Sequence, residues 1–544
     1  MVETKTLYSK YIIKNSEVIG MADVVSVSAL LALSSLGIYF HSVFVSITLG
    51  FPIAIMGLLY RYSKTGEQFY LSSAKKMTAV LAVNFALGAI TGTLVEFGLV
   101  QAWTGTIIAI SSFAFLPLTF ELIAFIWEIA TLVLFIVTLG KISPAKSFVI
   151  LFIYWVFAAL SGVLITTVNS WLVAPWGTGA VPAAIYPFMP EFGDAVVDVQ
   201  KLVLIKAILL ASGEPLHVIL QNPEVSSKLG IILSEPAVAF NTPYNLWSIV
   251  HNLTAAFIVG MSVALAGWMF AYSRRKDERY LSIAKSFFPV LLLLLLIQPT
   301  LFGHFMGEQV VNYNPTKFAM MENARESYSN PLVAIIAYGD PNHLIVGFDK
   351  FKSDCDKHGN ATVGDLLNSI GIAKNDIVSA SKAVGVSIEA ERLESTLRLK
   401  LRDVCIADLK KAEDRIAIVH AMYYTKIGGG ILALAAVIAF ASMLYRIPVL
   451  SSVVLRIMGE RYFLISLLTA AGAVISSALG WAVREVGRKP WTVYGLLSPE
   501  ELVNANSIVL SPVFISFMAL VILVIGTGGI VAMIIVSRRF GVIK

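Results

Sequence analysis

Two carboxylates interrupt one of the long apolar runs of this sequence. Glu121 and Glu128 lie within the run 105–139 and are seven residues apart, which is close to two turns of an α-helix and places both on one helix face. An ionised side chain costs several kcal/mol at the centre of a bilayer, so such residues usually face a cavity, a cofactor or a partner. The pair is therefore a candidate proton relay. The alternative is a protonated carboxyl that bonds to a neighbouring helix.

Histidine is rare in the chain, with seven residues in all. His41 and His251 lie within, or at the mouth of, apolar runs, and His420 stands at the start of another. Imidazole is a common axial ligand of haem iron, but a single histidine inside a membrane is also found as a hydrogen-bonded core residue. Residue type alone leaves both interpretations open.

A cluster of aromatic and charged residues follows a further apolar run. The segment GWAVREVGRKPWTVYGLL (480–497) contains Trp481, Arg484, Glu485 and Arg488. Aromatic and basic side chains commonly anchor a span at the membrane surface. That role does not explain Glu485, which lies between two arginines and beside tryptophans. The setting suits an anionic ligand, and Arg488 could pair with a haem propionate through a charge-assisted hydrogen bond.

The composition indicates which scaffold must hold these residues. The chain has 544 residues, of which 57% are hydrophobic and 14% charged, and its mean hydropathy is +0.78. A soluble domain carries about 25% charged residues, so a water-soluble globular protein is excluded. The net charge of +6 comes from basic residues that flank apolar runs, which does not indicate nucleic-acid binding. We predict an all-α polytopic membrane protein whose first span is retained rather than cleaved as a signal peptide.

Nine apolar runs are long enough to cross a bilayer, for which a helix needs about 20 residues. They are 24–60, 78–98, 105–139, 146–173, 246–273, 281–303, 421–445, 462–483 and 507–537. The links after the first, third, fifth and seventh runs carry an excess of Lys and Arg, which predicts that this side is cytoplasmic. The predicted units are 1–303, which contains six spans and an outer loop at 174–244, then an extracytoplasmic domain at 304–419, and 420–544 with three spans.

The only two cysteines, Cys355 and Cys405, both fall in the insertion 304–419. Two are too few for a disulfide scaffold or a cysteine-ligated zinc site. Because oxidation is allowed outside the cytoplasm, we predict a disulfide between them. Free buried thiols are the alternative.

Several motifs resemble those of subunit I of the cytochrome bd quinol oxidases. The segment GRKPW (487–491), which follows Gly480, Trp481 and Glu485, resembles the family's GW…E.GRQPW block. Three further segments resemble the family motifs QPTKLAAME, NSWMQTP and PLxxE, and a fourth resembles the histidine motif of its first helix. These segments are NPTKFAMME (314–322), VNSWLVAP (168–175), PLTFE (117–121) and YFHSVFVSITLG (39–50).

The resemblance implies a quinol:O2 oxidoreductase in the cytoplasmic membrane. In such an enzyme, quinol is oxidised at the outer face within an extracytoplasmic quinol loop. Electrons pass through a low-spin haem b to two high-spin haems, a haem b and either haem d or a further haem b, where O2 is reduced to water with protons from the cytoplasm. A second multi-spanning subunit is implied, together with small single-span subunits in some members.

The resemblance also implies roles for single residues. His41 and Glu485 match the axial ligands of the two high-spin haems, and His251 matches a ligand of the low-spin haem. Lys317 and Glu322 match the pair that contacts quinol. The residue types suit that task, because a cation can orient a quinone oxygen and a carboxylate can accept a proton. Without the motif, the pair would be interpreted as ordinary solvated charges on a loop.

The remaining matches concern the surroundings of the haems. Trp481 matches the indole between haems, and Arg488 matches the basic partner of a haem. Glu121 and Glu128 match the carboxylates near the oxygen-reducing haem. The family spaces these carboxylates one residue further apart, so Glu121, which stands in the PLTFE motif, matches the family more closely than Glu128 does.

A sharper departure occurs in the seventh run. Alignment of YYTKIGGG (423–430) with the family's YSFRIMVG puts Lys426 at the family's arginine and Gly428 at the methionine that is the second axial ligand. Glycine cannot bind iron. Met422 could replace that methionine if the register shifts, although it lies about 120° around the helix from position 428. Otherwise, an altered or five-coordinate low-spin site is expected.

Three other functions compete with the oxidase interpretation. An ion-coupled transporter would suit the buried carboxylates but should show inverted repeats, which the sequence lacks. A membrane scaffold or sensor would leave the intramembrane histidines unexplained. A divergent family member could bind haem and quinol without itself reducing O2, and the missing methionine at Gly428 keeps this alternative open.

Overall fold

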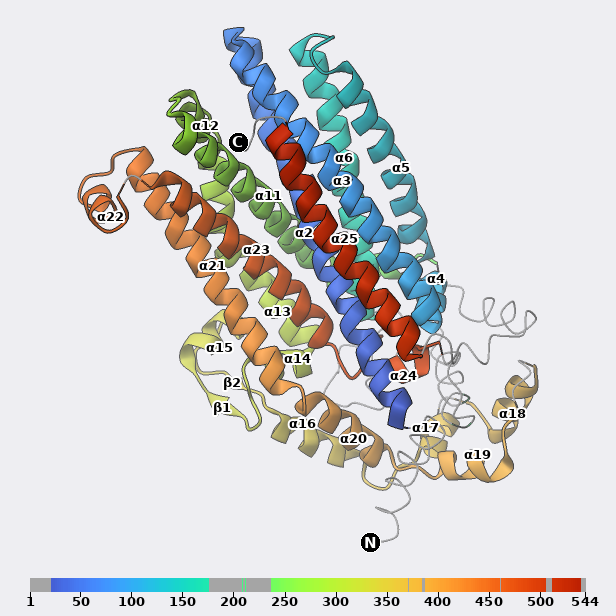
Figure 1. The fold of residues 1–544 in the computed structure, drawn as a ribbon. Helices are drawn as coiled ribbons and strands as arrows, with labels where there is room; N and C mark the ends of the chain where they lie inside the picture. The colour runs from blue at the N-terminus through green and yellow to red at the C-terminus, as the bar shows by residue number, and fades with distance from the viewer. Residues whose placement is uncertain are drawn as a thin grey trace.

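The fold is a bundle of long helices that carries a smaller helical domain at one end (Figure 1). The computed structural model describes residues 21–175, 208, 211, 236–369, 371–383, 387–459, 461–504 and 511–539. Most of the predicted outer loop 174–244 therefore lies outside the described residues.

Within the described part of the chain, nine helices are long and apolar enough to cross a membrane, so the predicted number of spans is confirmed. Eight of these spans are α2 (Met21–Thr65), α3 (Gln68–Ala102), α5 (Phe115–Thr138), α6 (Pro144–Val173), α11 (Asn245–Arg275), α21 (Ile416–Leu444), α23 (Tyr462–Val486) and α25 (Pro512–Arg539). The sixth span in chain order is made of three consecutive pieces, α12 (Arg279–Ile297), η3 (Gln298–Phe302) and α13 (Gly303–Tyr313).

The predicted run 105–139 is not one helix. It is divided into α4 (Thr104–Phe113) and α5, with Ala114 outside helical geometry at φ −132° and ψ 24°. Pro117 explains the break, because a proline ring clashes with the carbonyl four residues earlier, here that of Phe113, and lacks the N–H that would bond to it.

The sixth span runs past its predicted end at residue 303. At Pro299 the helix changes to a π turn, η3, and then continues as α13 to Tyr313. A π turn accommodates the missing proline N–H without ending the helix, and such turns are frequent at functional sites. The sequence expected as the beginning of the outer domain is therefore the last part of a span.

We use the name loop domain for residues 315–413, which follow this span. Its elements are α14 (Pro315–Met321), β1 (Tyr328–Ser329), α15 (Pro331–Tyr338), β2 (Leu344–Ile345), α16 (Phe348–Cys355), η4 (Asp356–His358), α17 (Val363–Ser369), α18 (Lys374–Ala383), α19 (Ala390–Leu397) and α20 (Leu401–Glu413). The two short strands pair antiparallel, with Tyr328 opposite Ile345. The other short elements are η2 (Val238–Asn241), α22 (Leu450–Met458) and α24 (Pro499–Leu502).

Small residues allow the central helices to pack backbone to backbone. A Cβ atom built on Gly260 of α11 would lie 2.6 Å from the Cα atom of Gly50 of α2. A similar approach joins α21 and α23, where a Cβ on Gly472 would lie 2.6 Å from the carbonyl oxygen of Gly429. Close contacts of this kind are typical of membrane helices, which gain stability from van der Waals packing rather than from the hydrophobic effect.

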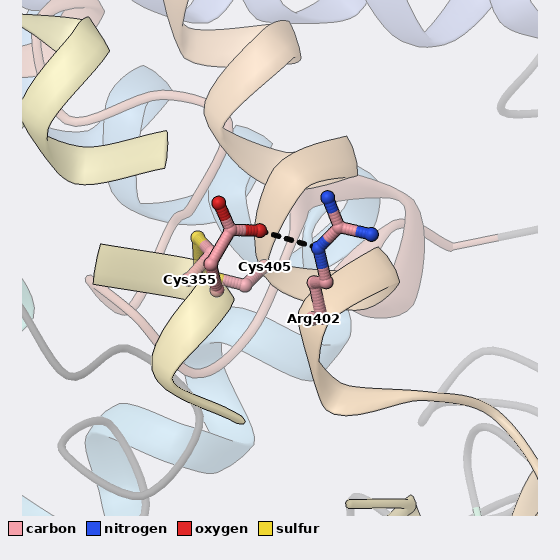
Figure 2. Close-up of a disulfide and its surroundings, with 4 residues drawn as sticks. Cys355, Arg402 and Cys405 are labelled. Carbon is pink, nitrogen blue, oxygen red and sulfur yellow. Dashed lines mark hydrogen bonds and ion pairs between the residues drawn. A yellow bond between two sulfur atoms is a disulfide. The ribbon is translucent and has the colours of Figure 1, made fainter. Parts of the chain in front are cut away.

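A disulfide joins two helices of the loop domain (Figure 2). Cys355 ends α16 and Cys405 lies in α20, with 5.9 Å between their Cα atoms. Both residues are fully buried. Beside them, the guanidinium of Arg402 donates a hydrogen bond to the carboxylate of Asp356. The bridge therefore fixes α16 against α20 at the base of the domain.

The contact between α2 and α11 can be tested with two glycines of α11. The Gly260→Ala variant should unfold at a lower temperature, because its methyl group collides with the backbone of Gly50 and overpacking costs about 1–3 kcal/mol. Gly267→Ala, two turns away with nothing within 4 Å of its added Cβ, should be neutral or slightly stabilising. Thermal unfolding in detergent measures both. Equal midpoints for the two variants would contradict the proposed contact.

The disulfide should stabilise the loop domain. It closes a segment of 50 residues, for which the chain-entropy model gives about 4 kcal/mol. We expect the Cys355→Ala/Cys405→Ala variant to be cut by protease within the loop domain at concentrations that leave the wild type intact. Treatment of the wild type with a reductant should reproduce this sensitivity. Thiols that react with maleimide in the unfolded, unreduced protein would show that the bridge does not form.

Candidate functional site

A cavity of about 380 Å³ lies between α11, the α12–α13 span, α21 and α23. This is within the range of about 300–1,000 Å³ that ligand pockets occupy. His251, Lys317, Lys426, Trp481 and Arg484 all line it. The structure thus brings together residues from four separate parts of the sequence.

His251 is held in place by the π turn of the sixth span. The side-chain amide of Gln298, the first residue of η3, donates a hydrogen bond of 2.9 Å to the carbonyl oxygen of His251 and lies 3.2 Å from its Nδ1 atom. Groups that orient an imidazole in this way are usual around metal-binding histidines. The residue is therefore arranged as a candidate axial ligand.

The cavity has an excess of positive charge. Lys317, Lys426 and Arg484 line it, and none of its lining residues in the described part of the chain carries a carboxylate. The Lys317 ammonium donates a hydrogen bond of 3.1 Å to the hydroxyl of Tyr244. Burial, together with Arg484 and Arg488, holds the pKa of Lys317 well below its ordinary value. An anionic group such as a haem propionate would relieve this repulsion, so the cavity fits one.

Glu485 faces α6 rather than the cavity. Its carboxylate accepts a hydrogen bond of 2.8 Å from the amide of Asn169 and another from Arg488. Arg488 is only 3% exposed, and among the described residues its Nε and Nη1 atoms have no acceptor. Buried donors without an acceptor are costly. These atoms therefore fit the carboxylate oxygens of a bound anion.

Trp481 and Arg484 lie between the cavity and the contact of Glu485 with α6. The Arg484 guanidinium carbon is 5.3 Å from the centre of the Trp481 ring, and Arg484 donates a hydrogen bond of 3.2 Å to the hydroxyl of Ser170. Such cation–π contacts hold both groups in a fixed relation. The α23 helix thus presents Trp481 and Arg484 to the cavity and Glu485 to α6.

His41 lies outside the cavity, where α2 meets α3. Its Nδ1 atom is 3.1 Å from the carbonyl oxygen of Gly88 and 3.2 Å from the hydroxyl of Thr91. A carbonyl can only accept, so Nδ1 carries the proton and Nε2 keeps its lone pair, as metal ligation requires. Gly92 leaves room for the ring, because a Cβ there would lie 2.9 Å from the His41 Cε1 atom.

The two carboxylates of α5 both face α6. Glu121 accepts a hydrogen bond of 2.8 Å from the hydroxyl of Ser161. Glu128 is buried beside the hydroxyl of Tyr154. Each carboxylate is therefore adjacent to a hydroxyl group, which is compatible with both the relay and the hydrogen-bonded interpretation.

The structure separates Lys317 from Glu322. Five residues on a helix correspond to about 140° of rotation, so the two side chains of this pair point in different directions. Lys317 faces the cavity, whereas the Glu322 carboxylate accepts a hydrogen bond of 3.0 Å from the hydroxyl of Tyr424. Burial raises the pKa of Glu322. Met321, the residue before it, does line the cavity.

The face that α21 turns to the cavity carries Tyr423, Lys426 and Ile427 but not Gly428. A Cβ atom on Gly428 would meet nothing within 4 Å, and the residue is exposed. Met422 packs with the apolar cluster of the loop domain instead. The geometry therefore does not favour Met422 as the second axial ligand. Two other methionines, Met306 and Met321, line the cavity.

Sequence reasoning missed several polar residues of these sites. Asn169 stands in the VNSW motif, which was recognised but given no role. Gln298 had a signal in the proline that follows it inside an apolar run. Tyr244 and His304 also line the cavity. Neither had a signal in the sequence, because each lies just outside a predicted membrane span.

Comparison with known proteins decides the family. The family described as cytochrome bd terminal oxidase subunit I matches residues 32–540. This chain belongs to that family. Family membership makes it a membrane-embedded, haem-binding oxidoreductase of the respiratory quinol-oxidase type, and it removes support for the ion-coupled transporter.

Two curated relatives of this subunit I family come from Bacillus subtilis (strain 168). One is a putative cytochrome bd menaquinol oxidase subunit I, 22% identical over 475 residues that cover 86% of this chain and 87% of the relative. The other is a cytochrome bd ubiquinol oxidase subunit 1, 21% identical over 474 residues that cover 86% and 84%. The solved structure of bd oxidase from Geobacillus thermodenitrificans matches with a TM-score of 0.63 and 17% identity, covering 94% of this chain and 98% of that one. The cytochrome bd fold is therefore shared.

The raised pKa of Glu322 predicts a pH dependence of stability. A carboxyl whose pKa is raised by folding stabilises the protein at low pH, and this contribution is lost as the pH rises through the raised value. Glu322→Gln cannot ionise, so its advantage over the wild type should grow from mildly acidic to neutral pH. Thermal unfolding across that range measures the difference. Glu326→Gln, at an exposed position of the same domain, should show no such trend, and a flat difference for Glu322→Gln would contradict the burial argument.

Proposed function

We propose that this chain is the haem-carrying subunit of a quinol:O2 oxidoreductase. The observation that carries the proposal is the cavity in which His251 lies with Lys426 and Arg484, and in which no described lining residue carries a carboxylate. A cavity of this chemistry suits an iron porphyrin, whose iron needs an imidazole and whose propionates need cations. Bound haem would supply the one-electron chemistry that links quinol oxidation to the reduction of O2 to water.

The residues divide among three haems. We assign His251 to a low-spin haem b, and His41 and Glu485 to two high-spin haems, one a haem b and the other haem d or a further haem b. The Nε and Nη1 atoms of Arg488, which have no acceptor among the described residues, support a propionate beside Glu485. Trp481, at the cavity wall next to Arg484, fits the role of an indole between haems.

Quinol is the proposed reductant. Lys317, at the loop-domain end of the cavity, would orient a quinol oxygen, and Glu322, next to Met321 of the cavity lining, would accept one proton. Protons for O2 reduction would enter from the opposite side through the carboxylates of α5, Glu121 and Glu128. Release on one side and uptake from the other make such a reaction electrogenic.

The assembly and location follow from the same proposal. The subunit would lie in the cytoplasmic membrane with its loop domain on the outer face, where the Cys355–Cys405 disulfide is stable. A second multi-spanning subunit would complete the oxidase, with small single-span subunits as further partners.

A second candidate function rests on the position of Gly428. A low-spin site without the family's methionine would have an altered potential, since the axial ligand is a main determinant of it. The chain would then bind haem and quinol without itself reducing O2. Reduced-minus-oxidised spectra and O2 consumption with quinol separate the two functions: haem bands without O2 consumption would support the second, and absence of haem bands would rule out both.

The assignments of His251 and Lys317 predict different defects. His251→Ala should remove the low-spin haem band, whereas Lys317→Ala should lower quinol oxidation about tenfold or more and leave all haems bound. The measurements are pyridine haemochrome analysis and O2 uptake. Lys410→Ala, an exposed lysine of the loop domain, is the matched control and should leave both unchanged. Loss of haem in Lys317→Ala would overturn the quinol assignment.

A further inference from the structure

The mouth of the cavity carries a histidine–carboxylate pair that the proposed function does not use. His304, on α13, lines the cavity together with Lys317 and His251. Its Nε2 atom is 3.3 Å from a carboxylate oxygen of Glu308, one turn further along the same helix. Their side chains are 32% and 34% exposed, whereas Lys317 is 2% exposed. The pair therefore marks the open end of the cavity.

The hydrogen bonds of His304 define which nitrogen is basic. Its Nδ1 atom lies 2.8 Å from the carbonyl oxygen of Ile336 of α15. Because a carbonyl only accepts, Nδ1 is the protonated nitrogen, and the neutral ring keeps its lone pair on Nε2. The Glu308 carboxylate lies 3.3 Å from Nε2 and would stabilise the ring once this nitrogen takes up a proton. The pair is thus built to accept one proton and to hold it as an ion pair.

The position of the imidazole is fixed by its neighbours. The ring of Phe305, the next residue, stacks on Trp247 of α11 with 4.2 Å between ring centres. Trp247 precedes His251 by one helical turn, so α13 is anchored close to the proposed electron acceptor. The bond to Ile336 anchors the other side of the ring to the loop domain.

We propose that His304, supported by Glu308, accepts a proton from quinol at the mouth of the cavity. This inference rests on the proposed function and deepens it. Oxidation of a quinol breaks two O–H bonds and releases two protons and two electrons, but Glu322 takes only one proton. His304 Nε2 takes the other. The two electrons would leave one at a time through the haem that His251 would hold, and O2 would be their final acceptor.

The charges around His304 explain why the carboxylate is needed. The other ionisable groups that line the cavity in the described part of the chain are His251, Lys317, Lys426, Arg484, Tyr244 and Tyr423. Of the elements packed on α13, α11 presents His251, α14 presents Lys317, and α15 presents the carbonyl of Ile336. All the charged groups in this set are cationic and oppose protonation of His304. Glu308 offsets them.

The test uses the assembled membrane oxidase with duroquinol as reductant. His304→Asn keeps a donor for the Ile336 carbonyl but has no basic nitrogen. We expect its kcat to fall about 100-fold, in the range that positioned acid–base groups contribute, with little change in KM. Anaerobic reduction of the low-spin haem by duroquinol should slow by the same factor. The haem spectrum and reduction by dithionite should be unchanged, which shows that the protein is folded and loaded.

Glu308→Gln provides a second, independent readout. Without the carboxylate, His304 is harder to protonate, so the acid limb of the kcat–pH profile should move to lower pH. A purely structural role for the pair would lower activity without moving this limb. The matched control is His343→Asn, because His343 is an exposed histidine of the loop domain whose Nδ1 atom lies 2.8 Å from the Leu344 carbonyl oxygen and whose ring stacks on Tyr338. It should behave as the wild type.

The outcomes distinguish this inference from the proposed function. A wild-type enzyme that oxidises duroquinol, together with a His304→Asn variant of equal rate, would overturn the role of His304 alone. An unmoved acid limb in Glu308→Gln would do the same. A wild-type protein without haem or without duroquinol oxidation would overturn the proposed function and this inference with it.

Discussion

The constraint around which this bundle is arranged is buried positive charge in a cavity where no described lining residue carries a carboxylate. Lys317, Lys426 and Arg484 converge on one cavity, and an ionised group in such surroundings is expensive unless it is paired. A lysine can lose its proton, but an arginine cannot. An anion bound in the cavity would offset the charge that remains. The cations and His251 reach the cavity from four different helices, α11, α14, α21 and α23.

Hydropathy alone was sufficient to predict the nine spans, because the length and apolar composition of a run decide whether it can cross a bilayer. Hydropathy was not sufficient to predict where the helices begin and end. Pro117 breaks a helix whereas Pro299 only induces a π turn, and the difference depends on the neighbours that each proline meets in the folded chain. The sequence motifs proposed roles for His41, His251, Lys317 and Glu485 without reference to packing, and these roles stay predictions.

The orientation of side chains could not be predicted in the same way. Which residues of α21 face the cavity depends on the rotation of the helix, and this rotation is set by the contact of Gly429 with Gly472 of α23. Motif alignment therefore placed Gly428 at the position of the family's axial methionine, although Gly428 does not line the cavity. His304 was assigned to the wrong side of a domain boundary, because an apolar run that contains a proline does not reveal where its helix ends.

The disulfide divides the loop domain into two parts that should differ in how well they tolerate changes in chain length. The helices α17, α18 and α19 all lie in the segment between Cys355 and Cys405, whereas α14 and α15, which border the cavity, lie before it. Lengthening a closed loop costs little free energy. Insertions or deletions between the cysteines can therefore accumulate during evolution without displacing the helices that border the cavity. Surface diversity among related proteins should concentrate in that segment.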